Sequence, residues 1–291
     1  MEEKIRKIFR QYSLKEIIRI LDARYGLGAI ERTLASNWFN PLYTLYLNFR
    51  SFPFKQAIRI PVFVYGFPHF YCLSGIMIVD GKVSTGMIKF NQTKPGAPSN
   101  MAVKSELNNE GTIIFRGKGL IGTGNKICVF QGATLDLGKN FKITDMCNIG
   151  CFTSIKIGDQ SWIVHRSQVL DSNYHYVANF LTRTVPKNAK PIHIGRDCWI
   201  SHSSTISGGA VLPDFTIVAS NSLVGKDFSS IPTNSMIGGT PARLITTGVR
   251  RINNSSIEKE IINHYNQNPN ILYSIPQDDD PDLYSFVDYF K

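Results

Sequence analysis

The chain has 291 residues, of which 43% are hydrophobic, and it carries a formal net charge of +10. This length and composition support a substantial core in one large domain or two smaller ones. We find no apolar run of about 18 residues and no basic-then-apolar leader with a cleavage site, so we expect a soluble cytoplasmic protein rather than a membrane-spanning or secreted one.

The basic balance suits phosphate-bearing or otherwise acidic ligands. It does not indicate nucleic acid, because the Lys and Arg residues are scattered and no recognised nucleic-acid motif accompanies them. The five cysteines form no CxxC pair, so we expect reduced, buried thiols and no metal site; they are Cys72, Cys128, Cys147, Cys151 and Cys198.

The first 110 residues contain two kinds of pattern. Residues 1–35 predict a helix, since "LKEIIRILDARYG" places apolar residues on one stripe and ends at Gly26. Residues 36–110 hold short apolar runs separated by Pro and Gly, which predict irregular strands leading into the next region. The aromatic and basic run "LYTLYLNFRSFPFKQAIRIP" is expected to pack on that region, with peripheral association with a membrane surface as the alternative.

A period of six dominates residues 111–247. From Ile194 onward every sixth residue is a branched aliphatic, and four positions later a second column holds only small residues: the first column is Ile194, Ile200, Ile206, Leu212, Val218 and Val224, and the second is Cys198, Ser204, Ala210, Thr216 and Ser222. Neither a helix nor an ordinary half-buried strand has this period. Short strands joined by turns, with each coil stacked on the last, do have it, so the pattern predicts a β-solenoid.

The repeat is interrupted once. The 25 positions between Val169 and Ile194 are not a multiple of six, so residues 171–191 are predicted to leave the solenoid as a loop. A loop that breaks a regular repeat is a favoured place for function. Beyond the solenoid, residues 248–291 predict a helix at "SSIEKEIINHYNQ" followed by an acidic tail.

The six-residue column, "PIHIGRDCWIS", "IVASNSLVGKD" and above all "IGGTPARLI" resemble the left-handed parallel β-helix acyltransferases, the hexapeptide-repeat family. The resemblance is strongest to the members that O-acetylate bacterial capsule and surface-polysaccharide sugars. It implies an all-β fold, acetyl-CoA as co-substrate, a carbohydrate acceptor, and a homotrimer with sites at the subunit interfaces.

Acyl transfer to a hydroxyl needs a base, and histidine has the side-chain pKa closest to neutrality. His175 lies in the loop, in "DSNYHY", and resembles the catalytic His of the family's D-x-x-x-H segment. Asp171 could orient the imidazole or instead cap the turn. Asn173 could place the acceptor or simply favour the bend. His193, His202 and His165 are more readily interpreted as solvated turn residues.

The resemblance also implies the donor site. Trp199 should point out of the solenoid, beside the groove for the acyl donor, or else form only a trimer contact. The small stretch containing Ala219 and Ser220 would let the pantetheine arm approach the backbone. Lys226 and Arg243 match positions that contact the nucleotide end of CoA, and solvated charges are the alternative.

The sequence therefore predicts an acetyl-CoA-dependent O-acetyltransferase for a surface polysaccharide sugar or its precursor. Two alternatives stay open. The acceptor could instead be an amino sugar, serine or a xenobiotic, or the chain could be a non-catalytic β-helix scaffold. A scaffold needs neither His175 in a loop nor "GGTPAR" at the end of the prism.

Overall fold

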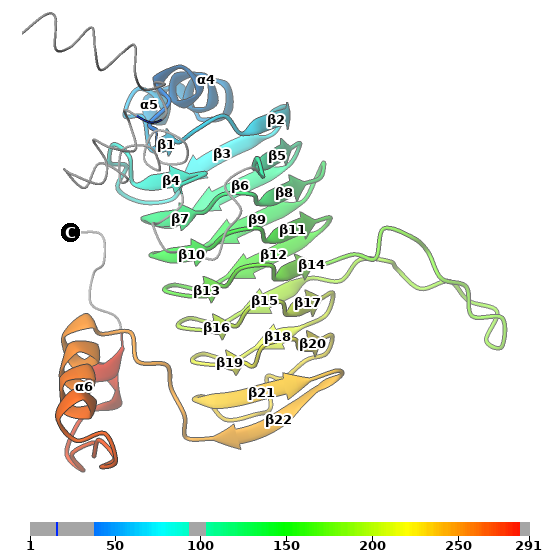
Figure 1. Cartoon of the computed structure of the whole chain (residues 1–291). Coiled ribbons are helices and arrows are strands. Elements are labelled where there is room, and N and C mark those ends of the chain that lie inside the picture. The colour runs from blue at the N-terminus through cyan, green and yellow to red at the C-terminus, as the bar shows by residue number, and fades with distance from the viewer. Residues whose placement is uncertain (1–15, 17–37, 93–102, 286–291) are drawn as a thin grey trace, which may run out of the picture.

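The computed structural model describes residues 16, 38–92 and 103–285. Most of them form a three-sided prism of short parallel strands, with the helices at its two ends (Figure 1). The helix predicted over residues 1–35 lies outside the described residues, except for Glu16, which is helical.

Each face of the prism is one parallel sheet, and successive strands along the chain move from one face to the next. The nine-stranded face consists of β1 (Val62–Val64), β4 (Ile88–Phe90), β7 (Gly119–Ile121), β10 (Phe141–Ile143), β13 (Trp162–Ile163), β16 (Trp199–Ile200), β19 (Ile217–Val218), β21 (Ser235–Gly239) and β22 (Ala242–Thr247). The last of these, β22, pairs antiparallel with β21 and ends the stack.

The other two faces have the same construction. The seven-stranded face consists of β2 (His69–Cys72), β5 (Glu106–Asn109), β8 (Lys126–Val129), β11 (Asn148–Cys151), β14 (Gln168–Leu170), β17 (Thr205–Ser207) and β20 (Leu223–Val224). The six-stranded face consists of β3 (Ile76–Val79), β6 (Thr112–Phe115), β9 (Thr134–Leu137), β12 (Ser154–Ile157), β15 (Ile192–Ile194) and β18 (Val211–Leu212).

The interior of the prism confirms the six-residue pattern. Every member of the aliphatic column from Ile194 to Val224 is fully buried, and the small column from Cys198 to Ser222 is buried beside it. Large and small residues alternate because the three faces meet around a narrow axis, where two large side chains on one corner would clash. The all-β class and the parallel β-helix predicted from the hexapeptide repeat are thus confirmed.

The prism begins earlier than the sequence pattern indicates. We expected the β-helix over residues 111–247, but β1, β2 and β3 already pair in parallel with β4, β5 and β6, so the first coil starts at Val62. The boundary at residue 111 is therefore wrong. The first coils lack the regular spacing because their corners are longer and their strands are joined by irregular turns.

Residues 38–61 differ from the expected irregular strands, because they contain α4 (Pro41–Ser51) and the short α5 (Phe54–Ala57). Asn40 caps α4 by accepting a hydrogen bond from the Tyr43 amide, and Pro41 occupies the first turn, where no amide donor is needed. Asn48 fastens the helix to the first strand, since its side-chain amide donates to the Val62 carbonyl at 2.7 Å. The helix therefore closes the N-terminal end of the prism.

The C-terminal segment follows the nine-stranded face. Residues 248–254 lead from β22 to α6 (Ser255–Gln267), and the single-turn η1 (Pro281–Tyr284) follows. The helix predicted at "SSIEKEIINHYNQ" is confirmed, with Asn254 as its N-terminal cap. Arg250 and Arg251 hold the segment against aromatic rings of the prism.

Candidate functional site

The loop predicted at residues 171–191 begins where β14 ends and returns where β15 begins. It projects from one edge of the prism as a long arm, the pale green trace at the right of Figure 1. Two isolated antiparallel bridges, Ser172 with Ala189 and Asn179 with Thr184, hold its two halves together. The loop thus leaves and rejoins the prism at nearly the same point.

Asp171 anchors the root of the loop. Its buried carboxylate accepts hydrogen bonds from the amides of Phe152, Thr153 and Ser154 at 2.7–3.0 Å and from the Thr153 hydroxyl at 2.9 Å. All four donors belong to the neighbouring coil and none to His175. Of the two roles considered for Asp171, the structure supports turn capping and shows no contact that orients the imidazole.

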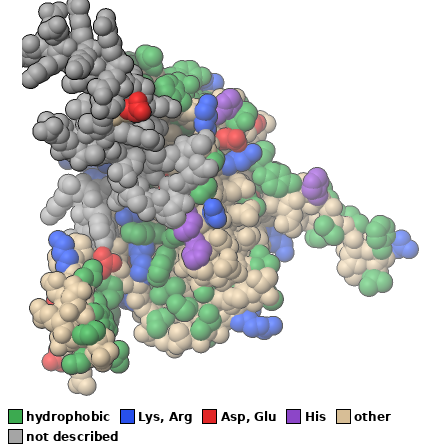
Figure 2. All heavy atoms as spheres, in the orientation of Figure 1, with side chains coloured by type: hydrophobic (Ala, Val, Ile, Leu, Met, Phe, Trp, Pro, Cys, Tyr) green, Lys and Arg blue, Asp and Glu red, His purple; other side chains and the backbone are tan. Residues whose placement is uncertain are grey.

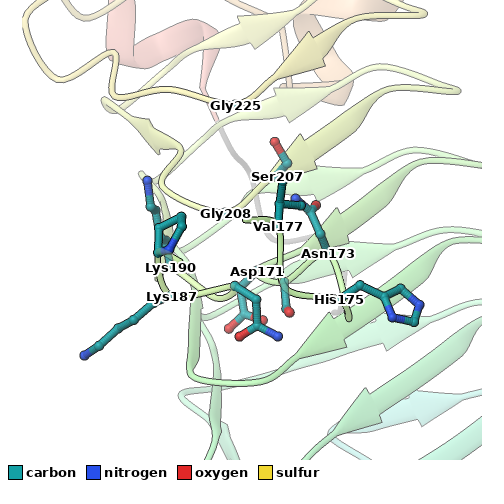
Figure 3. A pocket seen from close by; sticks show the side chains of 12 residues that line it. Asp171, Asn173, His175, Val177, Lys187, Lys190, Ser207, Gly208 and Gly225 are labelled. Atoms are coloured by element: carbon teal, nitrogen blue, oxygen red, sulfur yellow. The ribbon is translucent and has the colours of Figure 1, made fainter. Parts of the chain in front are cut away.

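His175 follows a tight bend. Tyr174 adopts a positive φ of 63°, and the His175 amide donates to the Asn173 carbonyl at 2.7 Å. The Tyr174 ring packs edge-on against Phe152, with ring centroids 4.7 Å apart. This contact fixes the bend to the prism and leaves the imidazole exposed, as Figure 3 shows.

His175 lines a cavity of about 320 Å³ between the loop and the prism edge. Asp171 and Asn173 line the same cavity, so the structure brings together the three residues predicted in the loop (Figure 3). The remaining lining residues come from both halves of the loop and from later coils: Ser172, Val177, Pro186, Lys187, Asn188, Lys190, Ser207, Gly208 and Gly225. Lys187 and Lys190 make this a cationic recess.

A second cavity, of about 230 Å³, adjoins the first because Ser207 and Gly225 line both. Lys226 and Arg243 line it together with Leu223, Pro241 and Ala242. Arg243 comes from β22 at the end of the prism, and Lys226 follows β20. The histidine and the two cations singled out in the sequence therefore line one continuous recess.

Trp199, Ala219 and Ser220 do not line either cavity of the single chain. Trp199 points out of the nine-stranded face beside Trp162, its partner on the neighbouring strand. The Arg251 guanidinium lies 4.0 Å from the Trp162 ring centroid and 5.9 Å from that of Trp199. A segment of the same chain thus contributes to the cover that an outward tryptophan requires.

Ala219 and Ser220 form the corner after β19. The Ala219 amide donates to the Ile237 carbonyl at 2.8 Å, and the Ser220 hydroxyl is hydrogen-bonded to His202 Nδ1 at 3.0 Å. The His202 ring stacks on that of His165 one coil earlier, with centroids 5.2 Å apart. Partial burial and the neighbouring His202 lower the pKa of His165. These residues form a separate corner of the prism.

The sequence did not predict that Ser207, Gly225 and the two loop lysines would line the cavity. Ser207 and Gly225 each follow a member of the buried aliphatic column, so alternation along the strand could have placed them on the outer surface. The path of the loop decides which of the outer positions line a cavity. The six-residue repeat does not specify that path.

The thiols lie away from this recess. Cys147, Cys151 and Cys198 are buried in the prism, and burial raises the pKa of each to about 12. Such thiols are poor nucleophiles and poor metal ligands at neutral pH. In the described ranges, no group of three or more His, Cys, Asp or Glu side chains is placed to hold a metal ion.

Comparison with known proteins gives structural resemblance only. No protein-family model matches the chain, and no curated protein does either. Among solved structures, it is similar to the polySia-specific acetyltransferase NeuO, with 18% identity, a TM-score of 0.42, and 70% of this chain and 84% of that chain covered. It is also similar to the polysialic acid O-acetyltransferase OatWY, with 17% identity, a TM-score of 0.40, and coverage of 67% and 97%.

A third similar structure is a hexapeptide-repeat acetyltransferase of Vibrio cholerae complexed with acetyl coenzyme A. The identity is 22%, the TM-score 0.39, and the coverage 46% of this chain and 70% of that chain. All three of these structures are acetyltransferases, and the third contains hexapeptide repeats. At TM-scores below 0.5 the likeness assigns no activity to this chain, so its chemistry must be argued from its own residues.

Proposed function

We propose that this protein is an acetyl-CoA-dependent O-acetyltransferase that acts on a hydroxyl of a bacterial surface polysaccharide sugar or its precursor. One observation carries the proposal: His175 and the cations Lys226 and Arg243 line two cavities that share Ser207 and Gly225. A base and a phosphate-binding cluster must lie within the length of one thioester donor for direct transfer, and this recess offers that arrangement.

Donor binding would begin at the end of the prism. Lys226 and Arg243 would hold the phosphates at the nucleotide end of CoA, since Arg and Lys bind phosphate through charge-assisted hydrogen bonds. The pantetheine arm would run past Ser207 and Gly225 towards His175, where outward side chains are small or absent.

His175 would act as the general base. Its imidazole would take the proton from the sugar hydroxyl as that oxygen attacks the acetyl carbonyl, and an amide of the recess would hold the oxyanion. The carbon–sulfur bond then breaks, and the leaving CoA thiolate receives the proton that the imidazole carries. Asn173 lines the same cavity and would orient the acceptor. Asp171 would contribute indirectly, by fixing the root of the loop.

A homotrimer would complete the site. The arm of residues 171–191 carries apolar side chains into solvent, with Phe180 77% and Leu181 97% exposed, and a neighbouring copy would cover them. A neighbour could also bring its Trp199 to the donor groove, because Trp199 does not line either cavity of its own chain. Ala219 and Ser220 would then line the pantetheine path at the corner beside that groove.

The N-terminal end of the prism indicates where the enzyme would meet its acceptor. Helix α4 exposes Leu42, Leu45, Tyr46 and Phe49, beside the cationic Arg50. Such a face would allow peripheral association with the inner face of an anionic membrane, where lipid-linked sugar precursors reside. No helix in the described ranges has the length and apolarity to cross a bilayer. We therefore propose a cytoplasmic enzyme that works at the membrane surface.

The experiment that tests the function measures release of CoA thiol from acetyl-CoA. Acceptors would include monosaccharides, nucleotide sugars, amino sugars, purified surface polysaccharides such as polysialic acid, serine and chloramphenicol. We expect release only with a carbohydrate, and a loss of about 10²–10⁴-fold in His175→Ala, the usual contribution of a general base. His193→Ala, which changes an exposed histidine outside both cavities, is the matched control and should retain activity.

Other outcomes would redirect the assignment. Release with serine or an amino sugar alone would move the acceptor class to those compounds. No release with any acceptor, together with no binding of acetyl-CoA by calorimetry, would favour the non-catalytic scaffold.

A further inference from the structure

The prism edge that carries the His175 loop has a second, larger hollow near the N-terminal end. Its volume is about 540 Å³, and it lies beside the end of α4 and the corners that follow β2, β5 and β8. Those strands all end on the side of the prism from which the arm leaves (Figure 1). The described hollow and the His175 cavity therefore share one edge.

Polar groups and glycines line this N-terminal hollow. Arg50 and Ser51 come from α4, Glu110 from the corner after β5, and Gly75, Gly111 and Gly132 from three successive corners. The Ser51 hydroxyl belongs to a residue only 3% exposed, and its oxygen has no hydrogen-bond partner in the described chain. Gly132 has a φ of 78°, and an added Cβ there would meet open space. Gly132 keeps its corner low, Gly75 and Gly111 let successive coils pack closely, and a buried polar atom lacks a partner there.

Aromatic rings bridge the two hollows. Phe130 begins the turn that contains Gly132, because the Ala133 amide donates to the Phe130 carbonyl at 2.9 Å. The Phe130 ring stacks on Phe152 of the next coil, with centroids 4.0 Å apart, and Phe152 contacts Tyr174, the neighbour of His175 in sequence. Phe130 and Phe152 are only partly buried. Apolar ring edges therefore continue along the prism edge from Gly132 to the His175 cavity. Figure 2 shows one face of the molecule, with the arm projecting at the right.

The length of this edge indicates the size of its ligand. From β3 to β15 the six-stranded face crosses four strand spacings, which at about 4.8 Å each amount to about 19 Å. That length exceeds a single sugar ring and suits several linked rings. Apolar ring edges can pack against the C–H groups of sugars, whose hydroxyls the polar hollows can bind.

Charge indicates the class of sugar. Arg50 lines one hollow, and Lys187 and Lys190 line the other, whereas the Asp171 carboxylate is buried and fully engaged by the neighbouring turn. Glu110 is the single carboxylate that lines the N-terminal hollow among the described residues. The excess of cations favours a negatively charged chain.

We infer that this edge, from the α4 hollow over Phe130 and Phe152 to His175, binds an extended acidic oligosaccharide, so that the acceptor is a polymer segment rather than a free sugar. This inference rests on the proposed function and specifies its acceptor. Binding along the edge would place one sugar hydroxyl at His175 while the rest of the chain lies on the rings. The gain from binding remote sugars would appear in transfer efficiency.

The test uses oligosialic acids, from the monomer to the octamer, as acetyl acceptors for the full-length protein. For the wild type we expect kcat/KM to rise at least tenfold with chain length and to level off once the chain spans the edge. Phe130→Ala and Phe152→Ala should flatten this rise, measured within each variant as the ratio of kcat/KM for the octamer to that for the dimer. Tyr265→Ala, on the distant helix α6, is the matched aromatic control. Phe152→Leu keeps apolar bulk without a flat ring, in case the alanine variant is unstable.

Two results would overturn the inference: a wild-type kcat/KM that does not depend on length, or full length dependence in both phenylalanine variants. If no sialic acid chain is acetylated, binding of the same ladder to His175→Ala decides the matter by calorimetry. Affinity that grows with length and is lost in Phe130→Ala would support the edge while refuting the transfer reaction on this acceptor. No binding at any length would overturn the inference, whatever the result of the CoA-release panel.

Discussion

Two groups of cations lie on the prism, one over aromatic rings of the nine-stranded face and one around the second cavity, and their roles differ. On the nine-stranded face, Lys142 and Arg251 lie over the Trp162 ring, 3.7 and 4.0 Å from its centroid, and Arg250 lies 3.7 Å from that of Phe215. There Arg250 and Arg251 fasten the C-terminal segment to the prism. Lys226, which follows β20, and Arg243, in β22, instead line an open cavity, and Lys226 also lies 4.9 Å from the Phe228 ring centroid.

The difference shows that residue type alone does not separate a structural contact from a binding site. Arg250 is held on several sides, since it also donates to Asn234 at 2.8 Å and pairs with Asp282 at 2.6 Å. A cation with its bonds made within the chain stabilises the fold, whereas one that faces a cavity is available to a ligand. Three predictions test this contrast.

The largest effect is expected at the root of the loop. Asp171→Ala leaves three backbone amides without their buried acceptor, and we expect a loss of about 3 kcal/mol in the free energy of unfolding. Asp214→Ala is the matched control. Its carboxylate also accepts an amide, from Arg196, but is 43% exposed, so we expect a loss of less than about 1 kcal/mol. Urea unfolding measures both. An Asp171→Ala variant of normal stability with a shifted pH profile of activity would instead support an orienting role towards His175.

A smaller effect is expected at Asp197, which is buried beside Arg196. Burial raises its pKa from 3.8 to about 6, although Arg196, Arg251 and Arg250 oppose the shift. The native state therefore takes up this proton at a higher pH than the unfolded chain does. The contribution of Asp197 to stability is full below its ordinary pKa and is lost as pH rises through about 6.

Asp197→Asn tests this linkage. Asparagine tolerates the positive φ of 53° at this position and keeps an acceptor for the Gln160 amide, which lies 2.7 Å from the carboxylate when its nitrogen faces Asp197. At neutral pH the variant should be more stable than the wild type by up to about 2 kcal/mol, and the difference should vanish towards pH 4. Thermal unfolding across this range measures it, and a pH-independent difference would contradict the assignment.

The smallest effect separates the two sets of cations. Lys226→Ala and Arg243→Ala should each raise the KM for acetyl-CoA about tenfold, the loss expected for one charge-assisted phosphate contact, with little change in thermal stability. Arg250→Ala, in the C-terminal segment, should leave this KM unchanged and lower the melting temperature. The contrast between the two groups of cations is contradicted if Arg250→Ala raises the KM as much as Arg243→Ala does.

The sequence alone determined much of this molecule because the narrow prism demands a strict residue pattern. The interior positions from Ile194 to Val224 could be predicted, since each six-residue repeat brings one large and one small side chain to the axis. The break in that period located the loop between Leu170 and Ile192 and, with it, His175. The irregular first coil could not be predicted from the sequence pattern, and only the strand pairing shows that it starts at Val62.

The tertiary structure decided what the repeat leaves unspecified, namely which outward residues meet across coils. In the folded chain Asp171 caps the turn at 152–154, and Arg251 lies over Trp199. His175 lines one cavity, Lys226 and Arg243 line another, and the two cavities share Ser207 and Gly225. These residues are distant in sequence, and a period of six constrains only the side chains that point inward. Outward side chains acquire their neighbours from the paths of the loop and the C-terminal segment, and so only the folded chain reveals them.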